Sequence, residues 1–213
     1  MKLSLIGMAG SGKSYWSCKL AQHYGFKRLW CDDMIAEKLA PELKACGYNR
    51  MTVAQWMGFP YETHYKEREE KYLACEREVM MEIIDQLESK GNEAEQDIVV
   101  DTTGSVIYAG DALLRRLGQC TTVVLLSTPP EVQKQLLEDY LSHPHPMVWR
   151  NMFEQRPHES PLEALQRCYP HLFKSREVLY KKYAHVTIDY YERRQKGFTA
   201  KNLLEQVHQA KYR

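Results

Sequence analysis

The sequence predicts a three-layer α/β fold, in which a five-stranded parallel sheet is covered by helices on both faces. Three observations predict it. Short apolar runs alternate with helical segments along the chain, which is typical of a parallel sheet. The runs at 97–100 and 121–126 are rich in β-branched residues without alternation, as expected for strands buried on both faces. The run at 2–7 leads directly into a glycine-rich phosphate-binding pattern, so the fold is that of a P-loop NTPase.

Residues 7–14 read GMAGSGKS and match the P-loop pattern G-x-x-x-x-G-K-[ST]. The glycines allow a tight turn whose N–H groups point at phosphate oxygens, and the following helix adds its positive dipole end. Lys13 would contact the β- and γ-phosphates, and the Ser14 hydroxyl would bind Mg²⁺. A chance match is disfavoured by the strand–loop–helix context. We therefore expect ATP and Mg²⁺ at Gly7, Ala9, Gly10, Ser11, Gly12, Lys13, Ser14 and Tyr15.

Size and charge bound the kind of protein. The 213 residues predict one domain spanning 1–213, with a lid segment around 140–170. The net charge of +1 gives no basic field that would favour nucleic acid or a membrane surface. The six cysteines form no C-x-x-C pair, and no apolar run is long enough to span a bilayer. We expect a cytoplasmic monomer or dimer that acts on small molecules.

The remaining elements follow from apolar periodicity and from residues that begin or end helices. Asp32 or Asp33 is expected to cap the helix after the second strand, and Pro41 and Pro170 are expected to break their helices. The Gly-Asn pair at 91–92 is expected to close the long charged helix before it. The predicted strands are 2–7, 26–31, 97–100, 121–126 and 185–189. The predicted helices are 14–24, 34–45, 52–57, 61–90, 108–117, 129–141, 162–183 and 199–212.

Acidic residues follow three of the predicted strands, at the sheet edge where ligands bind in α/β folds. Asp101 ends an apolar strand, as a Walker B aspartate does, and would hold Mg²⁺ together with Ser14. The alternative for Asp101 is a cap of the following turn. Asp32 would orient an acceptor hydroxyl or act as a general base, and its alternative is a helix cap. Asp189 follows the last strand.

Further stretches share a pattern with a known family. They are Asp32, V-A-Q-W at 53–56, E-x-x-Y-K-x-x-E at 62–69, Arg156-Pro157 and R-x-x-L-Y at 176–180. With the P-loop, they resemble the shikimate kinases, whose fold is of the nucleoside-monophosphate-kinase type, over residues 1 to about 195. The resemblance implies that Arg156 in the lid reaches the phosphates, with Arg150 as its rival. It also implies that Arg176 binds the acceptor carboxylate and that Arg193 lies near the adenine.

The chain departs from the family pattern on the acceptor side. Trp30 replaces the first aspartate of a D-x-D pair, and Thr102-Thr103-Gly104 replaces a triple glycine. Lys66 replaces an arginine that would grip a carboxylate bidentately, and Arg68 could take over its role. The acceptor site that the resemblance implies comprises Asp32, Lys66, Thr103, Gly104 and Arg176.

These patterns favour an ATP-dependent small-molecule kinase in which Lys13, Asp32 and Arg156 are catalytic and the acceptor is shikimate or a related anionic polyol. One alternative is a kinase of the same fold with another acceptor, such as a sugar acid, a cyclitol or a nucleotide. Another is a nucleotide-binding regulator without catalysis. The sequence His-Pro-His-Pro at 143–146 fits no standard zinc spacing and is interpreted as a semi-rigid loop of the lid.

Overall fold

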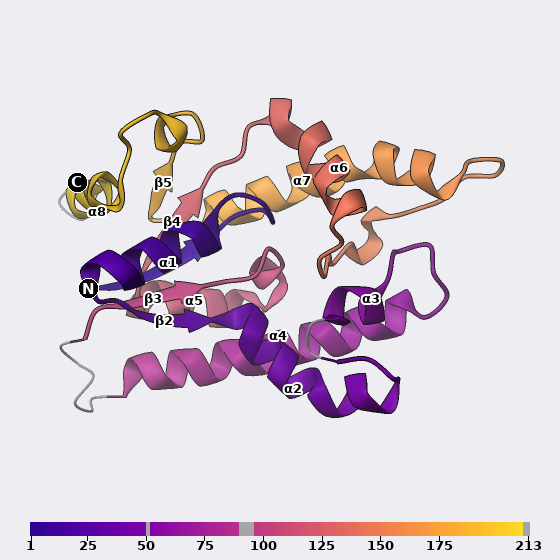
Figure 1. The fold of residues 1–213 in the computed structure, drawn as a ribbon, viewed down its shortest axis with the longest axis horizontal. Helices are drawn as coiled ribbons and strands as arrows, with labels where there is room; N and C mark the ends of the chain where they lie inside the picture. The colour runs from indigo at the N-terminus through magenta and orange to yellow at the C-terminus, as the bar shows by residue number, and fades with distance from the viewer. Residues whose placement is uncertain (50–51, 90–95, 211–213) are drawn as a thin grey trace.

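A computed structural model describes residues 1–49, 52–89 and 96–210. Its centre is a parallel sheet with the strand order β2-β3-β1-β4-β5 (Figure 1). In register, Leu5 lies beside Asp101 on one neighbouring strand and beside Val124 on the other, so the carboxyl ends of the central strands meet at one edge. The strands are β1 (Lys2–Ile6), β2 (Lys27–Trp30), β3 (Ile98–Asp101), β4 (Thr122–Leu126) and β5 (Val186–Ile188).

Helices connect the strands and cover both faces of the sheet. The α-helices of the described residues are α1 (Lys13–Tyr24), α2 (Cys31–Ala45), α3 (Val53–Met57), α4 (Tyr65–Glu88), α5 (Asp111–Cys120), α6 (Gln133–Ser142), α7 (Pro161–Tyr183) and α8 (Ala200–Ala210). Short 3-10 turns are η3 (Val106–Tyr108), η4 (Pro130–Val132), η5 (Arg150–Met152) and η6 (Glu192–Arg194). None of the helices in these ranges has the length and apolarity needed to cross a bilayer.

Two apolar clusters, one on each side of the sheet, form the core. Leu3 and Leu5 of β1 face α1 and α8, whereas Ile6 faces the larger cluster formed by α2, α4, α5 and α7 (Figure 1). Side chains of a strand alternate between the two faces, so one short apolar strand supplies both clusters. The predicted three-layer α/β fold with a five-stranded parallel sheet is thereby confirmed.

The predicted cap of α2 and the predicted breaks of α2 and α7 are wrong. Helix α2 begins at Cys31, directly after β2, so Asp32 and Asp33 lie in its first turn, and the capping residue Trp30 makes no side-chain cap bond. Carboxylates in a first turn still interact favourably with the helix dipole. Helix α2 continues through Pro41, and α7 continues through Pro170. Buried side chains on either side of each proline hold the helix together despite the lost backbone hydrogen bond.

The long charged segment forms one helix, α4, which begins at Tyr65 and not at the predicted residue 61. Its predicted end at Gly91-Asn92 lies outside the described residues, as does the predicted end of the last helix at 212. Residues 143–159 are irregular apart from the single turn η5, as predicted. This irregular segment joins α6 to α7 (Figure 1).

Candidate active site

The P-loop follows β1 and enters α1 with glycines at the positions that need them. Gly7 has a φ of 143°, and a Cβ there would lie 2.8 Å from the carbonyl oxygen of Leu126. Gly12 caps α1 with a φ of 94°. The loop therefore packs closely against β4 while its backbone turns into the helix, a conformation that other residues adopt only with strain.

Lys13 is buried and folds back over its own loop. Its Nζ atom donates to the carbonyl oxygens of Gly7 at 2.9 Å and Met8 at 3.0 Å. Burial lowers the pKa of Lys13, while the carboxylates of Asp32 and Asp101 raise it. The ammonium group is thus the positive centre of the loop, held between backbone oxygens and two strand-end carboxylates.

A cavity of about 560 Å³ opens beside the P-loop. Ser14 and Tyr15 line one side of it, and the start of α2 lines another through Trp30, Asp32 and Asp33. Residues of α3, Tyr72 of α4, the Thr103-Gly104 turn and the segment 144–146 complete the wall. A cavity of this volume is typical of small-molecule sites. The structure brings the predicted phosphate loop and the predicted acceptor-orienting Asp32 to one cavity.

Asp32 lies where an acceptor hydroxyl could meet a nucleotide phosphate. Partial desolvation of its carboxyl beside the P-loop raises the pKa of Asp32, Lys13 lowers it, and Asp101 raises it again. The carboxyl therefore holds a proton more readily than a surface aspartate does. Such a group can accept a hydrogen bond from a hydroxyl and help to move its proton.

Asp101 ends β3 as predicted and is fully buried. Its Oδ2 atom accepts from Ser17 Oγ at 2.9 Å and is paired with the guanidinium of Arg28 on β2. Its Oδ1 atom is buried without a partner among the described residues. A hydroxyl from Ser14 and a free carboxylate oxygen from Asp101 are the hard ligands that Mg²⁺ prefers, so the residues present fit this ion.

The part of the chain that the structure describes contains no group of three or more histidine, cysteine or acidic side chains that could hold a metal by itself. Mg²⁺ usually takes one or two protein ligands and completes its shell with phosphate oxygens and water. The ion would therefore bind together with the nucleotide.

The sequence analysis missed a buried acid behind the cavity wall. Glu76 of α4 accepts from Thr103 Oγ1 and from Ser105 Oγ, the latter at 2.7 Å. Burial raises the pKa of Glu76 to about 7, and the two hydroxyl donors lower it in part. Thr103 lines the cavity but is oriented by Glu76, so the threonine that replaces glycine has a defined hydrogen-bond partner. The sequence could have indicated a buried acid here, because Glu76 lies among the apolar residues of the buried face of α4.

Arg176 points inward and does not line the cavity. It is 1% exposed and donates to the carbonyl oxygens of Gly104, at 3.2 Å, and Val148. Tyr180 also donates to the Gly104 carbonyl. The arginine that was predicted to bind an acceptor carboxylate thus holds two backbone segments together.

Lys66 and its predicted substitute also lie outside the cavity. Lys66 is exposed on α4 in a surface depression beside Glu67 and Glu70. Arg68 donates to the carbonyl oxygen of Trp56, and its guanidinium lies 5.6 Å from the Trp56 ring. Neither side chain is among the residues that line the cavity.

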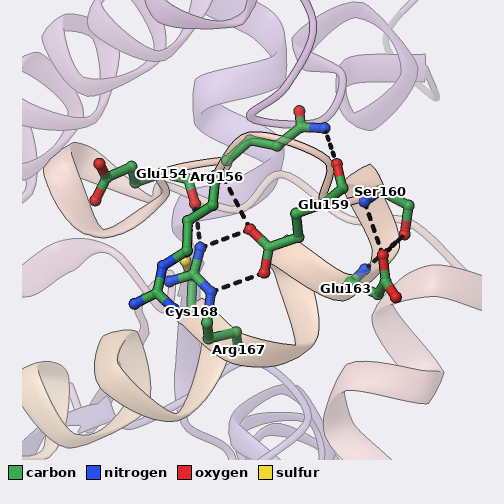
Figure 2. Close-up of polar contacts among 8 residues, drawn as sticks. Glu154, Arg156, Glu159, Ser160, Glu163, Arg167 and Cys168 are labelled. Carbon is green, nitrogen blue, oxygen red and sulfur yellow. Dashed lines mark hydrogen bonds and ion pairs between the residues drawn. The ribbon is translucent and has the colours of Figure 1, made fainter.

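Arg156 is exposed on the irregular segment before α7 (Figure 2). Its backbone N–H donates to Glu159 at 2.9 Å, and the same carboxylate accepts two bonds of 2.8 Å from Arg167. Arg150, its predicted rival, is exposed with Nη1 3.3 Å from Glu70. Neither arginine lines the cavity, so either would reach the phosphates only after this segment moves.

Arg193 supports the P-loop from behind. Its guanidinium donates to the carbonyl oxygens of Ser11 at 3.1 Å, Ser127 at 2.6 Å and Ile188 at 3.1 Å. Burial lowers the pKa of Arg193 to about 10. The side chain was predicted to lie near the adenine, and the structure places it in contact with the loop backbone.

The irregular segment supplies a histidine that the sequence analysis did not assign to the site. His145 lines the cavity between two prolines, with its ring 5.2 Å from that of Tyr140. Burial, together with smaller effects of Lys13 and Arg176, lowers the pKa of His145 to about 4, so the imidazole is neutral near pH 7. Its Nε2 atom is buried without a partner among the described residues.

The segment after His145 is held to α4. The Oε1 atom of Glu69 accepts from the Tyr65 hydroxyl at 2.6 Å and from the backbone N–H groups of Trp149 at 2.6 Å and Arg150 at 2.8 Å. The Tyr65 hydroxyl oxygen also lies 2.7 Å from the Met147 carbonyl oxygen and accepts from the Trp149 N–H at 2.9 Å. These bonds fix the position of the cavity wall that carries His145.

A phosphate-binding loop between the first strand and first helix of this parallel sheet defines the P-loop class of nucleotide-binding folds. Within this class the chain has the fold of the shikimate kinases. The Acinetobacter baumannii enzyme in complex with shikimate is 23% identical and superposes with a TM-score of 0.62, over 99% of this chain and 92% of that chain. The corresponding values are 20%, 0.59, 98% and 96% for shikimate kinase from Aquifex aeolicus, and 13%, 0.60, 100% and 99% for that from Bacteroides thetaiotaomicron. No family model and no curated protein sequence matches the chain.

Proposed function

We propose that this protein is an ATP-dependent kinase that transfers the γ-phosphate of ATP to a hydroxyl group of a small polyhydroxylated acceptor. The observation that carries the proposal is that Lys13, Ser14 and Asp32 line one cavity. Phosphoryl transfer requires positioning and charge neutralisation more than covalent chemistry, and these three residues supply both. The Acinetobacter baumannii neighbour was solved with shikimate, a small hydroxylated molecule, which supports an acceptor of this kind.

In this proposal each residue has a defined role. The N–H groups of the P-loop and the Lys13 ammonium bind the phosphates, and the acceptor hydroxyl donates its hydrogen bond to Asp32. Ser14 and Asp101 hold Mg²⁺, which neutralises charge on the phosphate oxygens when bound. Arg156 contributes to charge neutralisation only if residues 151–160, which lie beyond the part held by Glu69, close as a lid over the nucleotide. The six cysteines are free, which supports a reducing compartment such as the cytoplasm.

The test is formation of ADP by the purified protein with ATP and Mg²⁺ across a panel of acceptors that includes shikimate, sugar acids, cyclitols, sugars and nucleosides. Product formation should vanish in Lys13→Ala. It should fall by about a hundredfold or more in Asp32→Asn, with ATP affinity nearly unchanged. Glu37→Gln is the matched control, because this acid is exposed on the next turn of α2 and does not line the cavity.

ATP binding that depends on Lys13, with no transfer to any acceptor, would contradict the kinase proposal and favour a nucleotide-binding regulator. Phosphoryl transfer that persists in Asp32→Asn would contradict only the role assigned to Asp32, and the kinase proposal would stand. If the original protein did not bind ATP, the role assigned to the P-loop would be contradicted.

A further inference from the structure

We infer that the acceptor of this cavity is an uncharged polyol, with several hydroxyl groups and no carboxylate or phosphate. The inference rests on the proposed kinase function and names the chemical class of its second substrate. A neutral acceptor differs from the anionic acceptor that the resemblance to shikimate kinases implies. Three features of the cavity wall carry it: the placement of the cations, the placement of the acids, and an unpartnered neutral histidine.

The first feature is that Lys13 is the one cation among the described residues that line the cavity. Lys13 belongs to the P-loop, where the triphosphate requires it. Lys66 lies on the outer face of α4, next to two glutamates. An acceptor carboxylate would therefore meet no basic side chain of its own.

Arg176 does not line the cavity: its Nη1 and Nη2 groups donate to carbonyl oxygens, and its buried Nε makes no hydrogen bond to any described residue. It donates to Gly104 at 3.2 Å and also to Val148. Turning toward the cavity would take the donor from the buried Val148 carbonyl, which is costly in a protein interior, whereas the Gly104 carbonyl would keep the Tyr180 hydroxyl. The space beside Gly104 is also filled, since a methyl group there would lie 3.1 Å from Ala9 N and 3.3 Å from Arg176 Nη1.

The second feature is the acidic side of the cavity. Asp32 and Asp33 both line it from the first turn of α2. An acceptor carboxylate in the same space would meet two like charges, whereas hydroxyl groups would find oxygen atoms to which they can donate. The charge of the wall thus favours a neutral donor-rich ligand over an acid.

The third feature is His145, which lines the cavity from the segment after α6. The Nε2 atom of His145 is buried and has no partner among the described residues, and its neutral ring can pair with a hydroxyl. Trp30, which lines the cavity with 42% of its surface exposed, adds an apolar ring. The Arg28 guanidinium lies 4.4 Å from the centre of that ring and fixes it. A flat C–H face bordered by hydroxyl groups, as in a sugar or cyclitol, matches this combination.

Binding of matched pairs tests the inference without requiring transfer. Within each pair a carboxylate in one member is replaced by a CH₂OH group in the other, and the remaining hydroxyl groups are the same: shikimate and its primary alcohol, gluconate and glucitol, glucuronate and glucose. Affinities are measured by calorimetry with Mg²⁺ and a non-hydrolysable ATP analogue bound. The neutral member should bind about tenfold tighter or more in the pairs that bind. An acid that binds as tightly as its neutral partner, or no binding by any neutral polyol, would overturn the inference.

A charge variant gives a second measurement. Asp33→Asn removes one carboxylate from the wall and should reduce the preference for the neutral member by about threefold or more. Asp85→Asn is the control, since this acid is on the surface of α4, pairs with Arg116 at 2.9 Å and does not line the cavity. An unchanged preference in Asp33→Asn would contradict the argument from the acidic wall. Efficient transfer to acids would overturn this inference only, whereas absence of transfer to every acceptor would overturn the kinase proposal.

Discussion

The guanidinium of Arg193 donates a hydrogen bond to the carbonyl oxygen of Ser11 at 3.1 Å, which fastens the phosphate-binding loop to the far end of the chain. The same side chain donates to Ser127 after β4 and to Ile188 at the end of β5. One buried cation thereby joins the P-loop to two strand ends. The position of the loop N–H groups depends on a residue that does not line the cavity.

Replacing this arginine should weaken both the fold and nucleotide binding. Arg193→Met keeps much of the apolar bulk but removes one donor from each of three carbonyl groups, of which Ile188 keeps the Ser127 N–H, and we expect a loss of about 3 kcal/mol in the free energy of unfolding. ATP affinity should fall by about tenfold or more, because the loop loses its support. Urea unfolding and ATP titration measure the two effects. Arg194→Met is the matched control, since its guanidinium is exposed and contacts the Tyr190 ring at 4.4 Å. Equal effects of the two substitutions would contradict the inference that the hydrogen bonds of Arg193 hold the P-loop in position.

Glu69 should control the position of the segment that follows His145. Glu69→Leu removes the acceptor of the Arg150 N–H and leaves the Trp149 N–H with the Tyr65 hydroxyl alone, at 2.9 Å, so we expect a loss of about 3 kcal/mol in the free energy of unfolding. Glu69→Gln keeps one acceptor oxygen and should lose about half of that. Unfolding in urea measures the loss, and limited proteolysis between 143 and 160 measures the release of the segment.

The control for Glu69 is its exposed neighbour. Glu70→Leu removes only a surface ion pair with Arg150, for which the N···O distance is 3.3 Å, and should cost less than about 1 kcal/mol. If Glu70→Leu released the segment to proteases as fully as Glu69→Leu, the buried acid would not be its anchor.

The fold followed from local patterns, because apolar β-branched runs and a phosphate-loop spacing determine strands and their order in the chain. The course of α2 and α7 through Pro41 and Pro170 did not follow, because packing against the rest of the core outweighs one missing hydrogen bond. The start of α2 was also missed, since β2 enters the helix without a loop.

The residues of the site also fall into a predictable group, set by local patterns, and a group set by contacts between distant parts of the chain. Lys13, Ser14 and Asp32 were predicted because each occupies a position defined by a neighbouring strand or loop. The direction of Arg176 was not predictable, because it depends on carbonyl groups 72 and 28 residues away in the chain. Glu69 and Glu76 could have been found, since both interrupt the apolar stripe of α4.

Arg28 and Asp101 form an ion pair, and their substitutions should have non-additive effects on the free energy of unfolding. Arg28→Met leaves the buried Asp101 without its cation, and we expect a loss of about 3 to 5 kcal/mol in the free energy of unfolding. The double variant Arg28→Met/Asp101→Asn should be more stable than Arg28→Met alone, because it no longer buries an unpaired charge. A double-mutant cycle by urea unfolding measures the coupling. Strictly additive effects would contradict the pairing.

Glu76 should make the stability depend on pH. Its pKa is raised by burial from an ordinary value of 4.5 to about 7 in the folded protein. An acid whose pKa is higher in the folded state stabilises the fold fully below its unfolded pKa, and this contribution is lost as the pH rises through the folded pKa. The free energy of unfolding should therefore fall by about 3 kcal/mol between pH 4.5 and 8 because of this one group.

Glu76→Gln tests that pH dependence, because an amide cannot ionise yet can still accept from Thr103 and Ser105. Between pH 5 and pH 8 the variant should lose less stability than the original protein, and at pH 8 it should be the more stable of the two. Glu78→Gln is the control, since its carboxylate is exposed and pairs with Lys38 at 3.4 Å. Parallel pH profiles for the original protein and Glu76→Gln in urea unfolding would show that Glu76 ionises as readily in the folded chain as in the unfolded one, which its burial behind Thr103 argues against.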